Sequence, residues 1–337
     1  NFKAYQYNLF EHDFSLMNIT ENNFMNPYEL GRWTRAMKRA VRLWYFINNP
    51  YAVDDDPDFD YIYTKKIQRS LLRLNSFPYG YGSYMLNLVL AVLSKKLPQK
   101  NDDGILTEQE EINLTRVEKI LWTMERHNIM CFLLNGNKTN YNQETTFRDI
   151  NRYFRTEGTA YGISLSELLK ESRTSQFSWN NVSRNILQNQ NFYSWDGIHF
   201  ILREYEEIIS DKRVDSDISL NLLYPNEEYH SVRIFYQDIN SLTINNRVKY
   251  TYSLGNIFIS SNKQNPKSFQ EHKDRIKASL NRDSIVYDSE IELLSMDHWT
   301  KETVIIRGKK ILNAILDKWE IPHPTKENLY DSLFGHQ

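Results

Sequence analysis

The sequence predicts a mainly α-helical protein with a small α+β module in its C-terminal part. Glycine and proline are scarce, with 11 and 9 among 337 residues, which favours long helices over a many-turned β fold. Apolar residues recur at helical spacing over most of the first 210 residues. After Lys212 the pattern changes to short β-branched and aromatic runs. We therefore expect a helical domain over residues 1–212 and a second domain over residues 213–337.

The expected elements follow these patterns in chain order. The first helix covers residues 28–49, where Trp33, Met37, Val41 and Trp44 recur at helical spacing before Pro50 ends the run. Further helices are expected over residues 62–74, 83–96, 107–124, 147–155, 165–172, 179–188, 196–209, 268–280 and 301–319. Short strands are expected over residues 232–236, 248–252 and 257–259, separated by polar turns.

Composition limits the class of protein. Hydrophobic residues make up 40% of the chain and charged residues 25%, which is typical of a folded protein. The start is polar and no apolar run approaches the roughly 20 residues of a membrane span, so neither a secretory signal nor a membrane partner is expected. The single cysteine argues against a disulfide framework and against a thiolate zinc site. A cytoplasmic location is expected.

Charge is distributed unevenly along the chain. The formal net charge is −2, so the whole protein has no general attraction to nucleic acid. Residues 204–228 contain eight acidic and two basic residues, whereas residues 230–283 contain nine basic and four acidic ones. The expected helix at 28–49 has a basic face made of Arg32, Arg35, Lys38, Arg39 and Arg42. Either basic region could meet a polyanion, although a solvated helix face is the commoner use of such residues.

The segment from Leu254 to Trp319 carries a series of short motifs. Leu254-Gly255-Asn256-Ile257 is followed by Asn265, Phe269 and Lys273, and later by Trp299-Thr300, Ile306-Arg307, Leu312 and Trp319. This series resembles the C-terminal nuclease domain of GmrSD-type restriction endonucleases, which belong to the HNH (ββα-metal) nucleases. Residues 117–126 and 198–206 resemble the helices that precede that domain, so the resemblance covers about residues 110–320.

The resemblance implies a metal-dependent DNA endonuclease of a bacterial restriction or anti-phage system. Phosphodiester hydrolysis needs an activated water and neutralised phosphate charge, which one divalent ion (Mg²⁺ or Mn²⁺) and a nearby imidazole supply. By the family pattern Asn256 would orient the catalytic base and Asn265 would bind the metal. Lys273 and Arg307 would contact phosphate or hold the fold together. Further candidates for DNA contacts are the basic residues Arg247, Lys249, Lys263 and Lys267.

The first strand departs from the family pattern, in which an acidic residue and a histidine precede Ile-x-Pro. In one register Arg233 and Ile234 replace the acid and the base, and neither can serve, because Ile accepts no proton and Arg repels a metal. In the other register Glu228 and His230 share one face of an extended strand and converge on a metal, with His230 as the base. The first register predicts a catalytically degenerate site and the second an active one.

Three functions therefore remain open. The chain is a metal-dependent endonuclease acting on modified or phage DNA, a degenerate HNH-fold DNA-binding or scaffold module, or an interaction protein whose many Tyr and Trp residues dock a partner. The Asp-Gly-Gln-Gln-Arg motif of the ParB-like NTPase domain found in related proteins is absent from the sequence. We therefore expect a missing N-terminal NTPase domain or a stand-alone homo-oligomer. Of the other histidines, His199 is expected to pack within its helix and His272 to lie on an exposed helix face.

Overall fold

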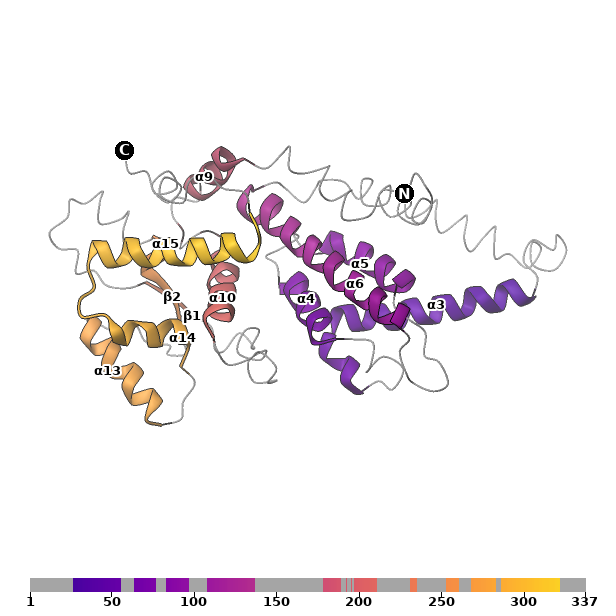
Figure 1. The fold of residues 1–337 in the computed structure, drawn as a ribbon, viewed down its shortest axis with the longest axis horizontal. Helices are drawn as coiled ribbons and strands as arrows, with labels where there is room; N and C mark the ends of the chain where they lie inside the picture. The colour runs from indigo at the N-terminus through magenta and orange to yellow at the C-terminus, as the bar shows by residue number, and fades with distance from the viewer. Residues whose placement is uncertain are drawn as a thin grey trace. The chain divides into compact units, whose positions relative to one another are not determined.

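A computed structural model describes residues 27–55, 64–76, 83–96, 108–136, 178–188, 192, 195, 197–210, 231–234, 253–260, 268–282 and 286–321. These residues are mainly helical, as the sequence predicts (Figure 1). The chain divides into two compact units. One holds residues up to Ile62 together with Val89–Val117, and the other holds Tyr63–Leu88 together with the chain from Glu118 onward. The domain boundary expected near residue 212 stays a prediction, because this division follows packing rather than chain order.

The first unit is built on the long helix α3 (Pro27–Asn48), which a 3₁₀ turn, η2 (Pro50–Asp55), follows. It also contains the second half of α5 (Ser83–Lys96) and the first half of α6 (Glu108–His127). Only the C-terminal end of α3 enters a core, at Leu43, Phe46 and Ile47. No side chain that the structure describes between Tyr28 and Arg42 is buried. Among the described residues, the fully buried side chains of this helix therefore lie in its last turns.

The second unit combines helices from distant parts of the chain. Its N-terminal contributions are α4 (Lys65–Ser76), the start of α5, and the second half of α6 with its π-helical continuation η3 (Asn128–Leu134). The helices α9 (Trp179–Gln188) and α10 (Ile198–Ile209) follow. The remaining elements are β1 (Ser231–Ile234), η5 (Leu254–Asn256), β2 (Ile257–Ser260), α13 (Phe269–Leu280), α14 (Asp288–Ile291), η6 (Glu292–Ser295) and α15 (Lys301–Lys318).

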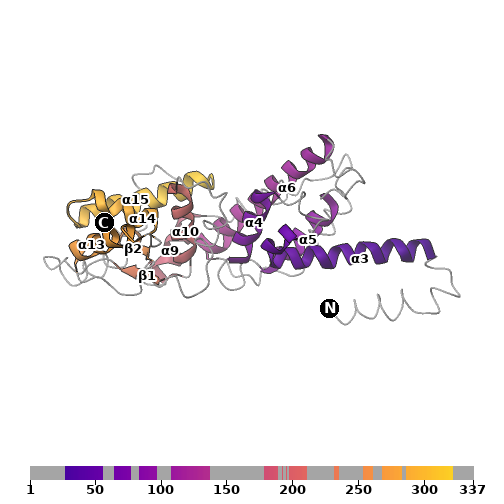
Figure 2. The same ribbon diagram turned by 90° about the horizontal axis from the view of Figure 1, so that it is seen from below.

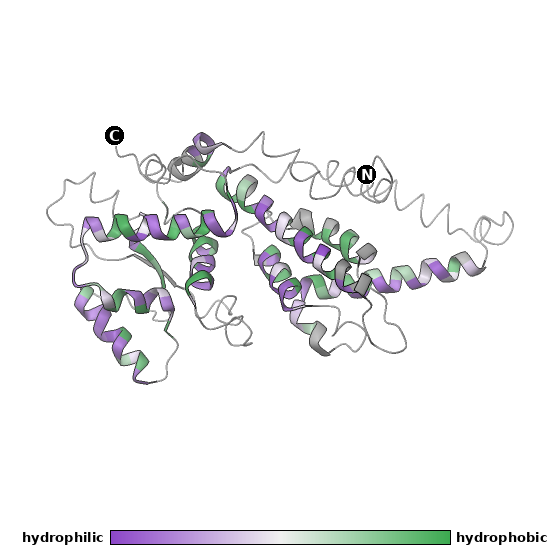
Figure 3. Ribbon diagram, in the orientation of Figure 1, coloured by the Kyte–Doolittle hydropathy of each residue, from purple (hydrophilic) through white to green (hydrophobic). Residues whose placement is uncertain are grey.

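The strands β1 and β2 pair antiparallel, with Ser231 opposite Ser260 and Ile234 opposite Ile257. Strand β2 lies between α15 and α14, and its first three residues are apolar, whereas α13 is largely hydrophilic (Figures 1 and 3). Because successive side chains of a strand point to opposite faces, Ile257 and Ile259 join the main core with α10 and α15. Phe258 points the other way and packs in a smaller core with Ile276 and Leu293. The strand is therefore buried on both faces.

Side chains define where the two long C-terminal helices begin. Ser268 precedes α13, and its hydroxyl accepts a hydrogen bond from the amide of Glu271 at 3.1 Å. Thr300 precedes α15 and forms a capping box with Thr303. Each cap satisfies an amide that the first helical turn leaves without a partner.

The predicted helices at 28–49, 62–74, 83–96, 107–124, 179–188, 196–209, 268–280 and 301–319 are confirmed to within a few residues, as are the strands at 232–236 and 257–259. The helices expected at 147–155 and 165–172 and the strand expected at 248–252 lie outside the described residues. Pattern analysis missed α14, a single turn too short to show a period. Within the described part of the chain, no helix combines the length and apolarity that a bilayer crossing needs.

Candidate functional site

The turn at Leu254–Ile257, which carries the Leu-Gly-Asn motif, is packed tightly against α15. Leu254 and Asn256 are both buried. A Cβ atom placed on Gly255 would lie 1.8 Å from the carbonyl oxygen of Val304 and 2.7 Å from the amide nitrogen of Gly308. Such distances are far inside van der Waals contact. Glycine is therefore required at 255 because the backbones of the turn and the helix approach each other closely there.

Arg307 fixes this contact from the helix side. Its guanidinium nitrogen Nη1 donates hydrogen bonds to the carbonyl oxygens of Gly255, at 2.8 Å, and of Ile257, at 2.7 Å. The side chain is only 2% exposed. Charge-assisted hydrogen bonds of this kind are stronger than neutral ones and satisfy two buried carbonyls. Arg307 thus holds the turn on α15, and its burial leaves it no surface at which to meet a phosphate.

Asn256 is wholly buried and also serves a contact within the fold. Its side-chain oxygen Oδ1 accepts a hydrogen bond of 2.9 Å from the indole nitrogen of Trp299. The Trp299 ring in turn packs against Phe269, with the ring centroids 5.5 Å apart. The motif residues Asn256, Phe269 and Trp299 therefore connect the turn, the start of α13 and the segment before α15.

Lys273, a predicted DNA contact, lies half-buried on α13. Its ammonium group donates to the carbonyl oxygen of Met296 at 2.7 Å and lies 5.5 Å from the centroid of the Phe269 ring. The remaining predicted site residues lie outside the described part of the chain. They are Glu228, His230, Arg247, Lys249, Lys263, Asn265 and Lys267. Among the residues that are described, no group of three or more His, Cys, Asp or Glu side chains could hold a metal ion.

The register of the two strands bears on the predicted position of a catalytic base. The ladder position next to Asn256 belongs to Ile234, which pairs with Ile257. Ser231, which follows His230 in the sequence, pairs with Ser260 at the other end of β2. The two ends are three residues apart, or about 10 Å along a strand. The last described pair of the ladder before Asn256 therefore consists of two isoleucines.

No family model, curated protein or solved structure matches the chain. The likeness to GmrSD-type nucleases accordingly rests on the motifs alone.

His272 differs from its expected place on an exposed helix face: it is only 3% exposed. Its ring packs edge-on against Phe258, with centroids 4.9 Å apart. Burial, with Arg275 and Arg307 adding to it, lowers the pKa of His272 to about 4. Glu290 lies 3.8 Å from its Nε2, beyond hydrogen-bond distance. His199, expected to pack within its helix, is exposed instead.

A buried cluster of charged side chains is the feature that sequence analysis missed. Arg73 of α4 reaches three carboxylates: Glu125 of α6, and Glu204 and Glu207 of α10. Its Nε lies 3.0 Å from Glu204 and its Nη1 lies 3.4 Å from Glu125, while Nη2 contacts Glu207. Lys318 of α15 lies 2.8 Å from both Glu204 and Glu207. We call these five residues the ion cluster.

An aromatic residue lies directly beneath the ion cluster. The ring of Trp319 is fully buried, with the Arg73 guanidinium 5.8 Å and the Lys318 ammonium 5.6 Å from its centroid. Trp122 stacks on the same ring at 6.2 Å. Cations above an indole gain from its negative face. The cluster and the stacked pair together join α4, α6, α10 and α15.

The carboxylates of the ion cluster differ in their acidity. Burial would raise the pKa of Glu207, but the nearby Arg73 and Lys318 lower it to about 2. Burial raises the pKa of Glu125, and the longer contact with Arg73 only partly opposes this. The charges of Arg73 and Lys318 are thus compensated by carboxylates of the same chain. This arrangement suits a structural joint better than an anion-binding or metal-binding site.

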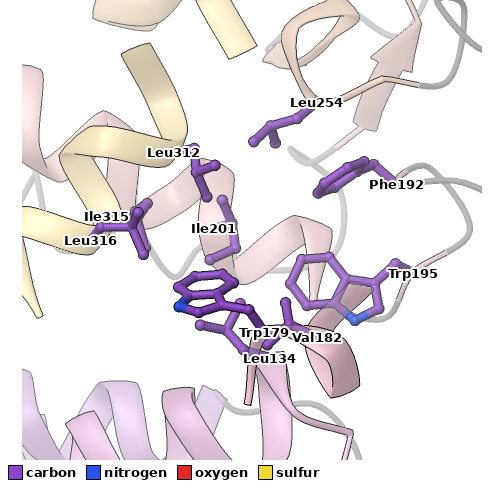
Figure 4. Close-up of a pocket in the computed structure, with 10 residues that line it drawn as sticks. All are labelled: Leu134, Trp179, Val182, Phe192, Trp195, Ile201, Leu254, Leu312, Ile315 and Leu316. Atoms are coloured by element: carbon purple, nitrogen blue, oxygen red, sulfur yellow. The ribbon is translucent and has the colours of Figure 1, made fainter. Parts of the chain in front are cut away.

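A small pocket in the second unit is lined by ten apolar side chains (Figure 4). They are Leu134, Trp179, Val182, Phe192, Trp195, Ile201, Leu254, Leu312, Ile315 and Leu316. Its volume of about 20 Å³ is close to that of one water molecule, and no titratable group lines it. Substrate sites combine a larger cavity with a few convergent polar groups. The pocket is therefore a packing gap in the core rather than a site for chemistry.

Proposed function

We propose that the C-terminal part of the chain is an HNH-like module that binds nucleic acid and whose cleavage centre is degenerate. The order of elements supports the first half of this proposal. Two antiparallel strands, β1 and β2, are followed by the helix α13, which is the order that a ββα nuclease domain requires. The Leu-Gly-Asn motif supports it further, because Gly255 and Asn256 are both committed to the packing of this region.

The observation that carries the second half is the strand register. Ile234 pairs with Ile257, the residue after Asn256, so the last described pair of the ladder before the predicted orienting residue carries side chains that cannot accept a proton. Its neighbour Arg233 is cationic and would repel a metal ion. The Asn256 oxygen already accepts the Trp299 indole N–H. This environment favours a module that has kept the packing of the motif without its general base.

The competing proposal is an active, Mg²⁺- or Mn²⁺-dependent endonuclease of a restriction or anti-phage system. It requires Glu228, His230 and Asn265 to form the metal site. Residue 230 directly precedes Ser231, which pairs with Ser260, four residues or about 13 Å along the chain from Asn256. The two proposals make opposite predictions for cleavage and the same prediction for binding.

The test is a supercoiled-plasmid assay run beside a binding assay on the full chain. We expect a DNA mobility shift at low salt in EDTA, and no nicking after addition of Mg²⁺ or Mn²⁺. His230→Ala and Asn265→Ala should leave both results unchanged, as should the control His199→Ala, which alters an exposed side chain. Metal-dependent nicking that His230→Ala and Asn265→Ala abolish, and His199→Ala does not, would establish the endonuclease instead. Absence of any DNA binding would refute both and leave a protein-docking module.

A further inference from the structure

Helix α3 carries a row of side chains that are exposed in the described part of its unit. Tyr28, Arg32, Arg35, Lys38 and Tyr45 follow one another at intervals of three, four or seven residues, so they lie on one face, within about 140° of the helix circumference. We call this row the α3 stripe. All five side chains are exposed, and Tyr28 and Tyr45 are 71% and 55% exposed. The helix runs as one continuous rod in both views (Figures 1 and 2).

The charge of the stripe is not balanced within its own helix. Among the 22 residues of α3, Glu29 is the only acid, against five Arg and Lys residues. Arg39 and Arg42 lie within the same sector of the helix, and both are half-buried. The three cations of the stripe therefore present their charge to solvent along about 9 Å of helix. Such a row attracts a polyanion whose charges repeat along a line.

The aromatic ends of the stripe narrow the class of polyanion. Tyr28 and Tyr45 lie about 26 Å apart along the helix and about 100° apart around it, with Arg35 and Lys38 between them. Proteins that bind single strands pair a basic track for the phosphates with aromatic rings on which unstacked bases lie. A duplex keeps its bases stacked internally and would use the cations alone. An anionic membrane would use a separate apolar face, here Met37 and Val41, rather than rings set in the charged row.

We propose that single-stranded nucleic acid binds along the α3 stripe, with its phosphates on Arg32, Arg35 and Lys38 and its bases against Tyr28 and Tyr45. This inference rests on the nucleic-acid-binding function proposed above and names the form of nucleic acid. It also accounts for a long helix whose first four turns bury no side chain that the structure describes. An isolated helix of that length is only marginally stable in water, so a partner along the stripe would stabilise it.

The test measures binding of the full chain to a fluorescent 20-nucleotide oligothymidylate and to a duplex of equal length, in EDTA, by anisotropy. The wild-type chain should bind the single strand more tightly. The variant with Arg32→Gln, Arg35→Gln and Lys38→Gln should bind it at least about tenfold more weakly, and the slope of log affinity against log salt should fall by about 2. The matched control changes three exposed cations elsewhere, Arg116→Gln, Lys119→Gln and Lys277→Gln, and should change affinity less than about twofold.

A second variant separates stacking from charge. Tyr28→Leu with Tyr45→Leu should weaken binding at least about fivefold while leaving the salt slope unchanged, because bases lose their stacking surface but phosphates keep their cations. Equal affinity of the stripe and control variants would overturn the inference and leave nucleic-acid binding by another surface intact. Preference for the duplex would overturn it too. A third outcome would also overturn it: the chain binds phosphatidylserine vesicles but no single strand, and Met37→Ser with Val41→Ser abolishes the vesicle binding.

Discussion

Gly255 lies where α15 passes closest to the backbone of the Leu254–Ile257 turn. The atoms nearest to its missing Cβ belong to the backbone of α15, which cannot swing aside as a flexible side chain could. Glycine is thus selected by space and not by an unusual dihedral angle, since its φ is not among the positive ones in the described chain. The same turn gives Arg307 two carbonyls and Trp299 one amide oxygen. The Leu-Gly-Asn motif therefore serves mainly to pack the turn against α15.

Gly255→Ala should destabilise the second unit by at least about 2 kcal/mol, because overpacked cores force backbone shifts. Urea unfolding followed by circular dichroism measures this. Gly31→Ala is the matched control, since a Cβ there would meet only the end of the Arg35 side chain, at 3.5 Å. Because glycine is unfavourable in a helix interior, this control should raise stability by about 0.5–1 kcal/mol. Equal effects of the two variants would show that the contact with α15 is unimportant.

Trp299→Phe removes the donor to Asn256 and keeps most of the ring that packs on Phe269. A buried acceptor that loses its partner costs about 1–3 kcal/mol, so we expect a loss of stability in that range. A double-mutant cycle with Asn256→Leu isolates the hydrogen bond, and the two losses should not add. Trp44→Phe, on the exposed side of α3, should change stability by less than about 0.5 kcal/mol. Additive losses for Trp299 and Asn256 would refute the coupling.

At the scale of elements, the ion cluster joins four helices that lie far apart in the sequence. Arg73 is 131 residues from Glu204 and 134 from Glu207. Removing one partner of a buried ion pair leaves an uncompensated charge, which costs more than the pair itself contributes. The cluster therefore ties α4 and α6 to α10 and α15, and it groups α4 with the C-terminal unit.

Arg73→Met should destabilise the second unit by about 3–5 kcal/mol, because Glu204 and Glu207 would then share Lys318 alone and Glu125 would lose its contact with Arg73. Adding Glu204→Gln and Glu207→Gln should recover much of that loss. Lys66→Met is the control: its pair with Glu118 is 3.4 Å long and the lysine side chain is 77% exposed, so the loss should stay below about 1 kcal/mol. A small effect of Arg73→Met, equal to that of Lys66→Met, would contradict a joint at this place.

Elements with a clear period could be predicted from the sequence. The helix at 83–96 and the helix at 179–188 were assigned to the residue, since each has a strong local pattern and a clear end. Contacts that depend on tertiary packing could not be predicted in this way. The acidic run that starts at Glu204 resembles a solvated face, yet Glu204 and Glu206 are buried because Arg73 and the amides of α14 meet them. His272 was misplaced for the same reason: it shares a helix face with Ile276, and β2 covers that face.

The candidate site was predictable only as a set of motif residues. Asn256, Phe269, Trp299 and Arg307 do come together, but spacing gave no hint that they bind one another. A sequence does not distinguish a buried arginine from an exposed one. The burial of Arg307 follows from the close approach of the two backbones at Gly255. The strand register likewise depends on the pairing of β1 with β2, which lie far apart in the sequence, and a single sequence leaves it open between two choices.

For the whole molecule, the buried ionisable groups govern how stability depends on pH. His272 titrates near pH 4 in the fold and near its ordinary 6.5 when unfolded, so its contribution is complete above about pH 6.5 and is lost as pH falls toward 4. Glu207 adds a second loss below its ordinary value of 4.5, as pH falls toward 2. Glu125 and Glu206 act in the opposite sense, because burial raises their pKa and their protonation relieves a buried charge.

His272→Gln separates the first of these effects from the others. Between pH 7.5 and pH 5 the free energy of unfolding of the native chain should fall by about 2 kcal/mol through His272. The reason is that His272 becomes protonated in the unfolded state but stays neutral in the folded one. In the variant this part of the pH dependence should vanish, whereas His298→Gln, which changes an exposed side chain, should keep it. Urea midpoints for the three chains at both pH values measure the difference. Parallel curves for all three would mean that His272 is accessible to protons in the fold, and that Phe258 and α14 do not enclose it.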